Sequence, residues 1–186
     1  MMASSDTIAE KATEFYSLVG VAVTDWAHID QELFRVCADI LKSDGQHAAI
    51  VYYRTPTLSA RLTLIDELIH TIFPKPIRKS GGHPSQSEKM WGKLHNDIDE
   101  ELSVRNQLAH SPSGLLIESP GEATAPPHWV TDVRYASYMS ATEKLRGRDH
   151  RKELKVGDVK DHLKKVKGLF IRLRNFRESE LSKLLL

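Results

Sequence analysis

Cysteine is nearly absent from this chain: its 186 residues include only one, Cys37. A single cysteine excludes an internal disulfide framework, because no second thiol is present to pair with it. Without a partner, Cys37 is expected to be a small buried hydrophobic residue in a protein that resides in a reducing compartment.

Long hydrophobic runs and an excess of one charge are also missing. No apolar run reaches the roughly 20 residues that a membrane-spanning helix needs, and the N-terminal stretch MMASSDTIAEK has no basic-then-apolar signal region. The formal net charge is +1, so no global field indicates nucleic acid or membrane. We therefore expect one soluble, cytoplasmic domain over residues 1–186 that does not bind membranes.

Apolar residues repeat at spacings of three and four in four segments, which is the period of an amphipathic helix. The predicted helices cover residues 6–41, 57–73 and 87–111, and a last one begins near residue 157. The turn-forming residues 43–45 are expected to end the first helix. The predicted inner faces include Phe15, Trp26, Ile29, Leu33, Val36, Leu62, Ile65, Ile69, Trp91, Leu94, Ile98, Leu102, Val159, Leu163, Val166 and Leu173.

The helical period is lost from about residue 113 to 156. Short apolar runs at 115–117 and 129–135 flank the turn residues 119–122, a pattern typical of a β-hairpin. Four helices with one apolar face each pack most simply as a bundle. The predicted fold class is therefore all-α: an antiparallel bundle of about four helices, with a β-hairpin or irregular excursion between helices 3 and 4.

The stretch VRNQLAHSP, residues 104–112, carries the residues best suited to chemistry. Arg105 follows Ile98 by seven residues and so continues the inner face of the third helix, where a guanidinium needs a partner or a cleft. His110 falls in the last turn, whose carbonyls favour a protonated imidazole. Arginine binds phosphate oxygens through a planar fork of donors, and histidine transfers protons near neutral pH.

Asn106 precedes His110 by four residues, so it lies on a neighbouring face and is placed to hydrogen-bond the imidazole or a substrate. By composition, Arg-Asn-x-x-x-His is much rarer than an Arg and a His at similar spacing. A structural interpretation stays open beside the functional one. In it, Arg105 pairs with an acid such as Asp66 or Glu101, and His110 only caps carbonyls at the helix end.

With this motif the sequence resembles the HEPN superfamily, whose signature is an Arg, usually followed by a polar residue such as Asn, and a His four to six positions after the Arg. Arg105, Asn106 and His110 match all three elements. The resemblance implies a helical bundle that cleaves RNA without a metal or cofactor, as a homodimer. It also implies that His110 is general base or acid, that Arg105 stabilises phosphoryl charge, and that Asn106 orients His110.

Inactive members of the superfamily leave a second hypothesis open, because a fold does not fix a function. The alternative is a non-catalytic module that binds a nucleotide or a partner protein, for example part of a toxin–antitoxin or defence system. Its partner would be a cognate antitoxin or a nucleotidyltransferase. The Arg on an inner face and the C-terminal residues 182–186, SKLLL, favour a dimer in either case.

Basic residues are concentrated near the C-terminus: residues 143–177 hold thirteen Lys or Arg and five Asp or Glu. Lys160, Lys164 and Lys167 are the predicted contacts to an RNA backbone. The alternative is a solvated charged face balanced by acids elsewhere in the chain. No metal site is predicted, because His95 adjoins the inner-face Leu94 and is expected to face outward or sideways.

Overall fold

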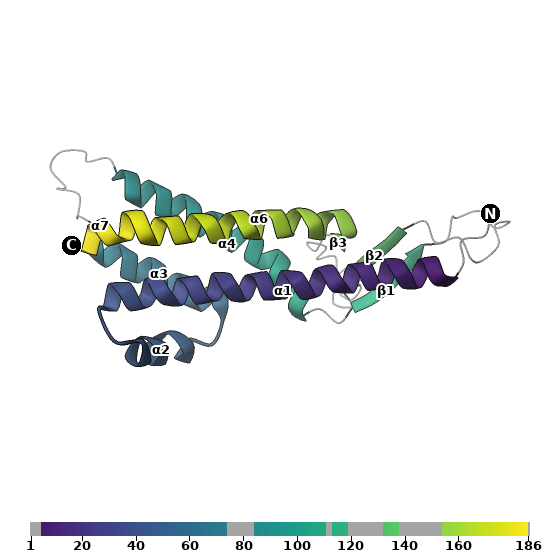
Figure 1. Ribbon diagram of the computed structural model, residues 1–186, viewed down its shortest axis with the longest axis horizontal. Helices are drawn as coiled ribbons and strands as arrows, with labels where there is room; N and C mark the ends of the chain where they lie inside the picture. Colours follow the sequence, from purple (N-terminus) through teal and green to yellow (C-terminus); the bar gives the residue numbers. More distant parts are fainter. Residues whose placement is uncertain (1–4, 74–83, 111–112, 119–131, 138–153, 186) are drawn as a thin grey trace, which may run out of the picture. The chain divides into compact units, whose positions relative to one another are not determined.

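The computed structural model describes residues 5–73, 84–110, 113–118, 132–137 and 154–185. The chain is mainly helical, as the sequence predicts (Figure 1). The contacts between residues divide it into two compact units, which are described separately below. In chain order the elements are α1 (Ser5–Leu41), α2 (Gly45–Arg54), α3 (Leu58–Ile72), α4 (Gln86–His110), β1 (Ser113–Glu118), β2 (Asp132–Ser137), β3 (Leu154–Lys155), α6 (Val156–Asn175), η1 (Phe176–Leu181) and α7 (Ser182–Leu185).

The larger unit comprises Asp25–Ser103 and Lys165–Leu186 and is a helical bundle. Its core is built by the predicted inner faces, so their assignment is confirmed; the buried side chains include Trp26, Ile29, Leu33, Val36, Leu62, Ile65, Ile69, Trp91, Leu94, Ile98, Leu102, Val166 and Leu173. Cys37 is buried in the same core, as expected, and this burial raises the pKa of its thiol.

Contacts between side chains fix the directions of the helices in this unit. The start of α4 is hydrogen-bonded to η1, and later positions on α4 are hydrogen-bonded to progressively earlier positions on α6, so α4 and α6 are antiparallel. The pairs are Ser87–Glu180, Asp97–Arg172 and Glu101–Lys165. α1 runs parallel to α6, because His28 contacts Phe170 and Asp39 contacts Arg177.

The Ser-Asp-Gly turn ends the first helix, as predicted, and also begins a helix that the sequence analysis missed. Lys42 has a φ of 47°, a left-handed conformation that commonly ends a helix. Asp44 then caps α2: its Oδ1 accepts hydrogen bonds from the backbone amides of Gln46 at 3.1 Å and His47 at 2.9 Å. α2 was missed because it is only ten residues long and buries two side chains, which are too few to show a helical repeat in the sequence.

The smaller unit comprises Met1–Thr24 and Val104–Lys164. β1 pairs with β2 in antiparallel register from Ser113↔Ser137 to Glu118↔Asp132, so the predicted antiparallel pairing of two strands in the excursion is confirmed. β3 pairs with the other edge of β2 and completes a three-stranded sheet that the sequence analysis did not foresee. Among the described residues of this unit, the buried apolar side chains are Phe15, Ala22, Leu108, Leu154, Val159 and Leu163.

Some predicted features lie outside the described residues: the loop 74–83, the turn 119–122, Trp129, the basic residues 144–152 and the side chain of His110. The C-terminal leucines are described as far as Leu185. Leu184 and Leu185 are partly buried against the core of the larger unit. They are therefore packed within their own chain, and the sequence argument that they favour a dimer loses its basis.

Candidate functional site

The predicted motif lies in the smaller unit, at the C-terminal end of α4. Arg105 is half-buried and Asn106 is exposed, and Arg105 Nη1 donates a hydrogen bond to Asn106 Oδ1 at 3.1 Å. α4 ends at His110, close to the predicted end. The structure therefore brings Arg105 and Asn106 together and places the backbone of His110 about one helical turn beyond Asn106.

The local sequence explains the position of Arg105. Leu102 and Leu108, three residues before and after it, are both buried. Positions three apart lie on the same face of a helix, so Arg105 belongs to the inward row of α4, as predicted. The long arginine side chain carries the guanidinium from this row to the exposed amide of Asn106.

Asp66 and Glu101, the acids suggested as partners for Arg105, each have a contact elsewhere. Trp91 Nε1 donates to Asp66 Oδ1 at 2.7 Å, and Lys165 Nζ donates to Glu101 Oε1 at 2.5 Å. Glu101 is buried, so a charge-assisted hydrogen bond from the lysine offsets part of the cost of removing its carboxylate from water. Asp66 and Glu101 thus each contact a residue outside the motif, and the pairing of Arg105 with an acid stays an open alternative.

The three predicted backbone-contacting lysines are exposed along α6. Lys160 Nζ lies 2.7 Å from Glu14 Oε1, and Lys164 Nζ lies 3.2 Å from Asp161 Oδ1. Ion pairs this exposed are weak and are screened by salt. Lys160 and Lys164 belong to the same unit as the motif, whereas Lys167 belongs to the larger unit.

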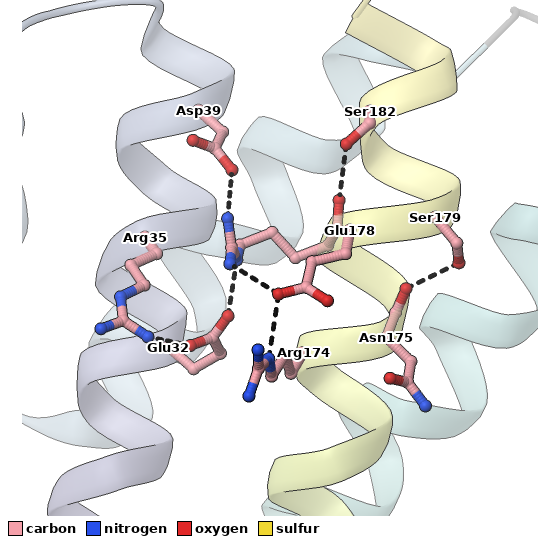
Figure 2. Close-up of polar contacts among 9 residues, drawn as sticks. Glu32, Arg35, Asp39, Arg174, Asn175, Glu178, Ser179 and Ser182 are labelled. Carbon is pink, nitrogen blue, oxygen red and sulfur yellow. Dashed lines mark hydrogen bonds and ion pairs between the residues drawn. The ribbon is translucent and has the colours of Figure 1, made fainter.

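An ion-pair network in the larger unit was not found from the sequence (Figure 2). Its centre is Arg177, whose guanidinium contacts the fully buried Glu32 at 2.5 Å, Asp39 at 3.3 Å and Glu178 at 3.4 Å. Burial disfavours the charged form of Arg177, but the hydrogen bonds to Glu32 and Asp39 have the larger combined effect. The pKa of Arg177 is therefore raised. Arg35 also binds Glu32, at 2.7 Å.

The network sits on an irregular helical segment. η1 is a π-helix, and the backbone N–H of Ser182 donates to the carbonyl of Arg177, five residues earlier. Such segments are rare and are often found at functional sites. One sequence feature indicated part of this arrangement: Glu32 lies three residues after the inner-face Ile29, so its charge had to be paired inside the protein.

His162 is a second residue that the sequence analysis missed. It is buried on α6, in the same unit as Arg105. The signal was present, because His162 lies three residues after Val159 and four before Val166, both on the predicted inner face. The unit that carries the motif therefore also holds a buried imidazole.

Among the described residues, no group of three or more His, Cys, Asp or Glu side chains is arranged to hold a metal ion. Within the same residues, no helix is both long enough and apolar enough to cross a membrane.

No protein-family model matches the chain. Neither the curated proteins nor the solved structures include one that is significantly similar to it. Its function is therefore argued from its own residues.

Proposed function

We propose that this chain is a metal-independent endoribonuclease of the HEPN type that acts as a homodimer. The observation that carries the proposal is the hydrogen bond from Arg105 to Asn106, in a helix that ends at His110. This contact orients the guanidinium beside the helix end. A guanidinium recognises phosphate oxygens, and an imidazole nearby in sequence supplies proton transfer.

In the proposed reaction the 2′-hydroxyl of the RNA attacks the adjacent phosphorus. The new oxygen–phosphorus bond forms as the bond from phosphorus to the 5′-oxygen breaks. His110 takes the proton from the 2′-hydroxyl or gives one to the leaving 5′-oxygen, and Arg105 stabilises the charge that builds on the phosphoryl oxygens. The products carry a 2′,3′-cyclic phosphate and a 5′-hydroxyl.

The two proton transfers explain why the proposal includes a second copy of the chain. One His110 fills one of the two roles, and His110 of the partner subunit fills the other. Two-fold symmetry would bring two copies of the motif to one groove. Lys160, Lys164 and Lys167 would follow the RNA backbone, a contact that depends strongly on salt.

Cleavage of RNA by the purified protein in EDTA tests the proposal. We expect RNA to be cut, DNA of the same sequence to survive, and the products to carry the end groups given above. His110→Ala should lower the rate roughly 10²- to 10⁴-fold by removing a proton-transfer group. Arg105→Ala should lower it by about 10²- to 10³-fold. His28→Ala, at an exposed position on α1, is the matched histidine control and should leave the rate unchanged.

The lysines are tested by binding rather than by rate. Lys167→Ala should weaken RNA binding and reduce its salt dependence, whereas Lys93→Ala, at an exposed position on α4, should do neither. Mixed dimers of wild-type and His110→Ala chains show whether both histidines are needed.

Two outcomes contradict the ribonuclease proposal: the protein cuts no RNA, or the His110→Ala protein cuts it as well as the wild type. In either case the alternative replaces it. The chain is then a non-catalytic module that binds a nucleotide or a partner protein, such as an antitoxin or a nucleotidyltransferase.

A further inference from the structure

α2 carries three exposed large apolar side chains within four residues. Ile50 is 54% exposed, Val51 is 44% exposed and Tyr53 is 49% exposed, within a helix of ten residues. Single exposed apolar residues are normal on a protein surface, but a cluster of them commonly marks an interaction site. α2 buries only Ala48 and Tyr52 on its inner side.

The surface of α2 is held rigidly by the rest of the larger unit. The hydroxyl of Tyr52 donates to Asp30 Oδ1 at 2.7 Å, and Arg61 Nη1 donates to both carboxylate oxygens of Asp30. The Arg61 guanidinium also lies 5.2 Å from the ring centres of Tyr52 and Tyr53. Phe34 contacts the Tyr53 ring as well. An ordered aromatic surface loses little entropy on binding, so it is suited to recognition.

The outward face of α2 also has a defined charge pattern. His47, Ile50, Val51 and Arg54 lie three and four residues apart and are all exposed, so they form one face of the helix. Arg54 is at the C-terminal end of this face. Asp44, the exposed N-cap residue, is at the other end. The face is therefore apolar at its centre, with Arg54 at one end and, at the other, Asp44, which also contacts His47 at 2.9 Å.

We propose that α2 forms a two-fold contact with α2 of a second copy of this chain. A two-fold axis packs the same face against itself, and antiparallel packing of the two helices places Arg54 of each copy beside Asp44 of the other. The midpoint between these residues is residue 49. At 1.5 Å per residue, the two Ile50 side chains are then offset by only about 3 Å along the helix axis.

A second copy fits this face because the face is complementary to itself. The charged residues at its ends meet residues of opposite charge, and the apolar residues at its centre meet each other. The helix is about 15 Å long, so the contact covers less than the roughly 800 Å² per partner of a standard stable interface. We infer a weak and reversible dimer. The same two-fold contact would pair the two chains of the proposed homodimer, but the inference rests on the geometry of α2 and does not depend on whether the chain cleaves RNA.

Sedimentation velocity over a range of protein concentrations, without RNA, tests the contact. We expect the wild type to dimerise between about 10 and 200 µM, in the range of weak interfaces. Ile50→Glu should remain monomeric, because two buried like charges would meet near the axis. Ile171→Glu is the matched control: Ile171 is 57% exposed but lies on α6, so the variant should dimerise as the wild type does.

Charge and cross-linking variants test the antiparallel register. Arg54→Glu should weaken the dimer by placing two acids together. Ile50→Cys should form a cross-linked dimer on oxidation, whereas Gln46→Cys should not, since its two copies are offset by about 9 Å along the axis. A wild type that stays monomeric over the whole range overturns the proposal. So does a dimer that Ile50→Glu leaves intact, which would mean that another surface is used.

Discussion

Replacing Arg177 with Ala is expected to destabilise the folded protein far more than replacing the neighbouring Arg174. Arg177 is 21% exposed and holds the fully buried carboxylate of Glu32, whereas Arg174 is 56% exposed and pairs with the exposed Glu178. Loss of Arg177 therefore leaves one oxygen of a buried carboxylate without its charged donor, while loss of Arg174 affects only the surface (Figure 2).

The expected loss of stability depends on which hydrogen-bond donors Glu32 retains in the variant. Removing the only partner of a buried charge costs about 3–5 kcal/mol. Arg35 still donates to Glu32 at 2.7 Å in the variant, so the loss is closer to that of one hydrogen bond to a charged group, about 1.5–3 kcal/mol. For a chain of this size, that loss lowers the melting temperature by about 3–12 °C.

Thermal unfolding followed by circular dichroism, with urea unfolding as a second measurement, compares the wild type with the Arg177→Ala and Arg174→Ala variants. Arg174→Ala should melt with the wild type. The double variant Glu32→Met/Arg177→Met should be more stable than the sum of its single variants predicts, because it removes the buried charge together with its donor. Equal losses for Arg177→Ala and Arg174→Ala would refute the reasoning.

Two further predictions concern stability. Trp91→Phe removes the donor to Asp66 Oδ1 and should cost about 1.5–3 kcal/mol in urea unfolding, whereas Asp66→Asn keeps an acceptor and should cost less. The second concerns acid pH: the hydrogen bond from Arg174 lowers the pKa of Glu178, and those from Ser87 and Lys183 lower that of Glu180. Because each folded pKa lies below the unfolded value of about 4.3, the stability that these groups contribute is present above that pH and is lost as pH falls through the folded values. The urea midpoint of the Glu178→Gln/Glu180→Gln variant should therefore fall less than that of the wild type between pH 6 and pH 3, and equal falls would contradict this assignment.

The long helices were predictable because their apolar faces extend over several turns. Trp26, Trp91 and Ile98 lie on stripes that repeat for ten residues or more, and all three are buried in the core. α2 was not predictable in this way: three of its six apolar residues are exposed, and two buried positions do not establish a period. Asp44 was a cap signal, but its turn was assigned only to the end of the preceding helix.

Part of the candidate site could also be predicted from the sequence. The inward position of Arg105 followed from helical periodicity, and its contact with Asn106 joins two of the three motif residues. Contacts between distant segments could not be predicted. Lys160 pairs with Glu14, and Arg177 pairs with Glu32, and both pairs depend on how helices far apart in the chain pack together.

The central claim is that the 2′-hydroxyl of RNA attacks phosphorus at a site built from Arg105 and His110. The most direct measurement uses an RNA whose cleavage position has been mapped with the wild-type protein, together with the same RNA carrying a single 2′-deoxy nucleotide immediately 5′ of that bond. The account predicts that the wild type no longer cuts at this bond and still cuts the all-ribose RNA in EDTA. Cleavage of the substituted bond at an undiminished rate would contradict it.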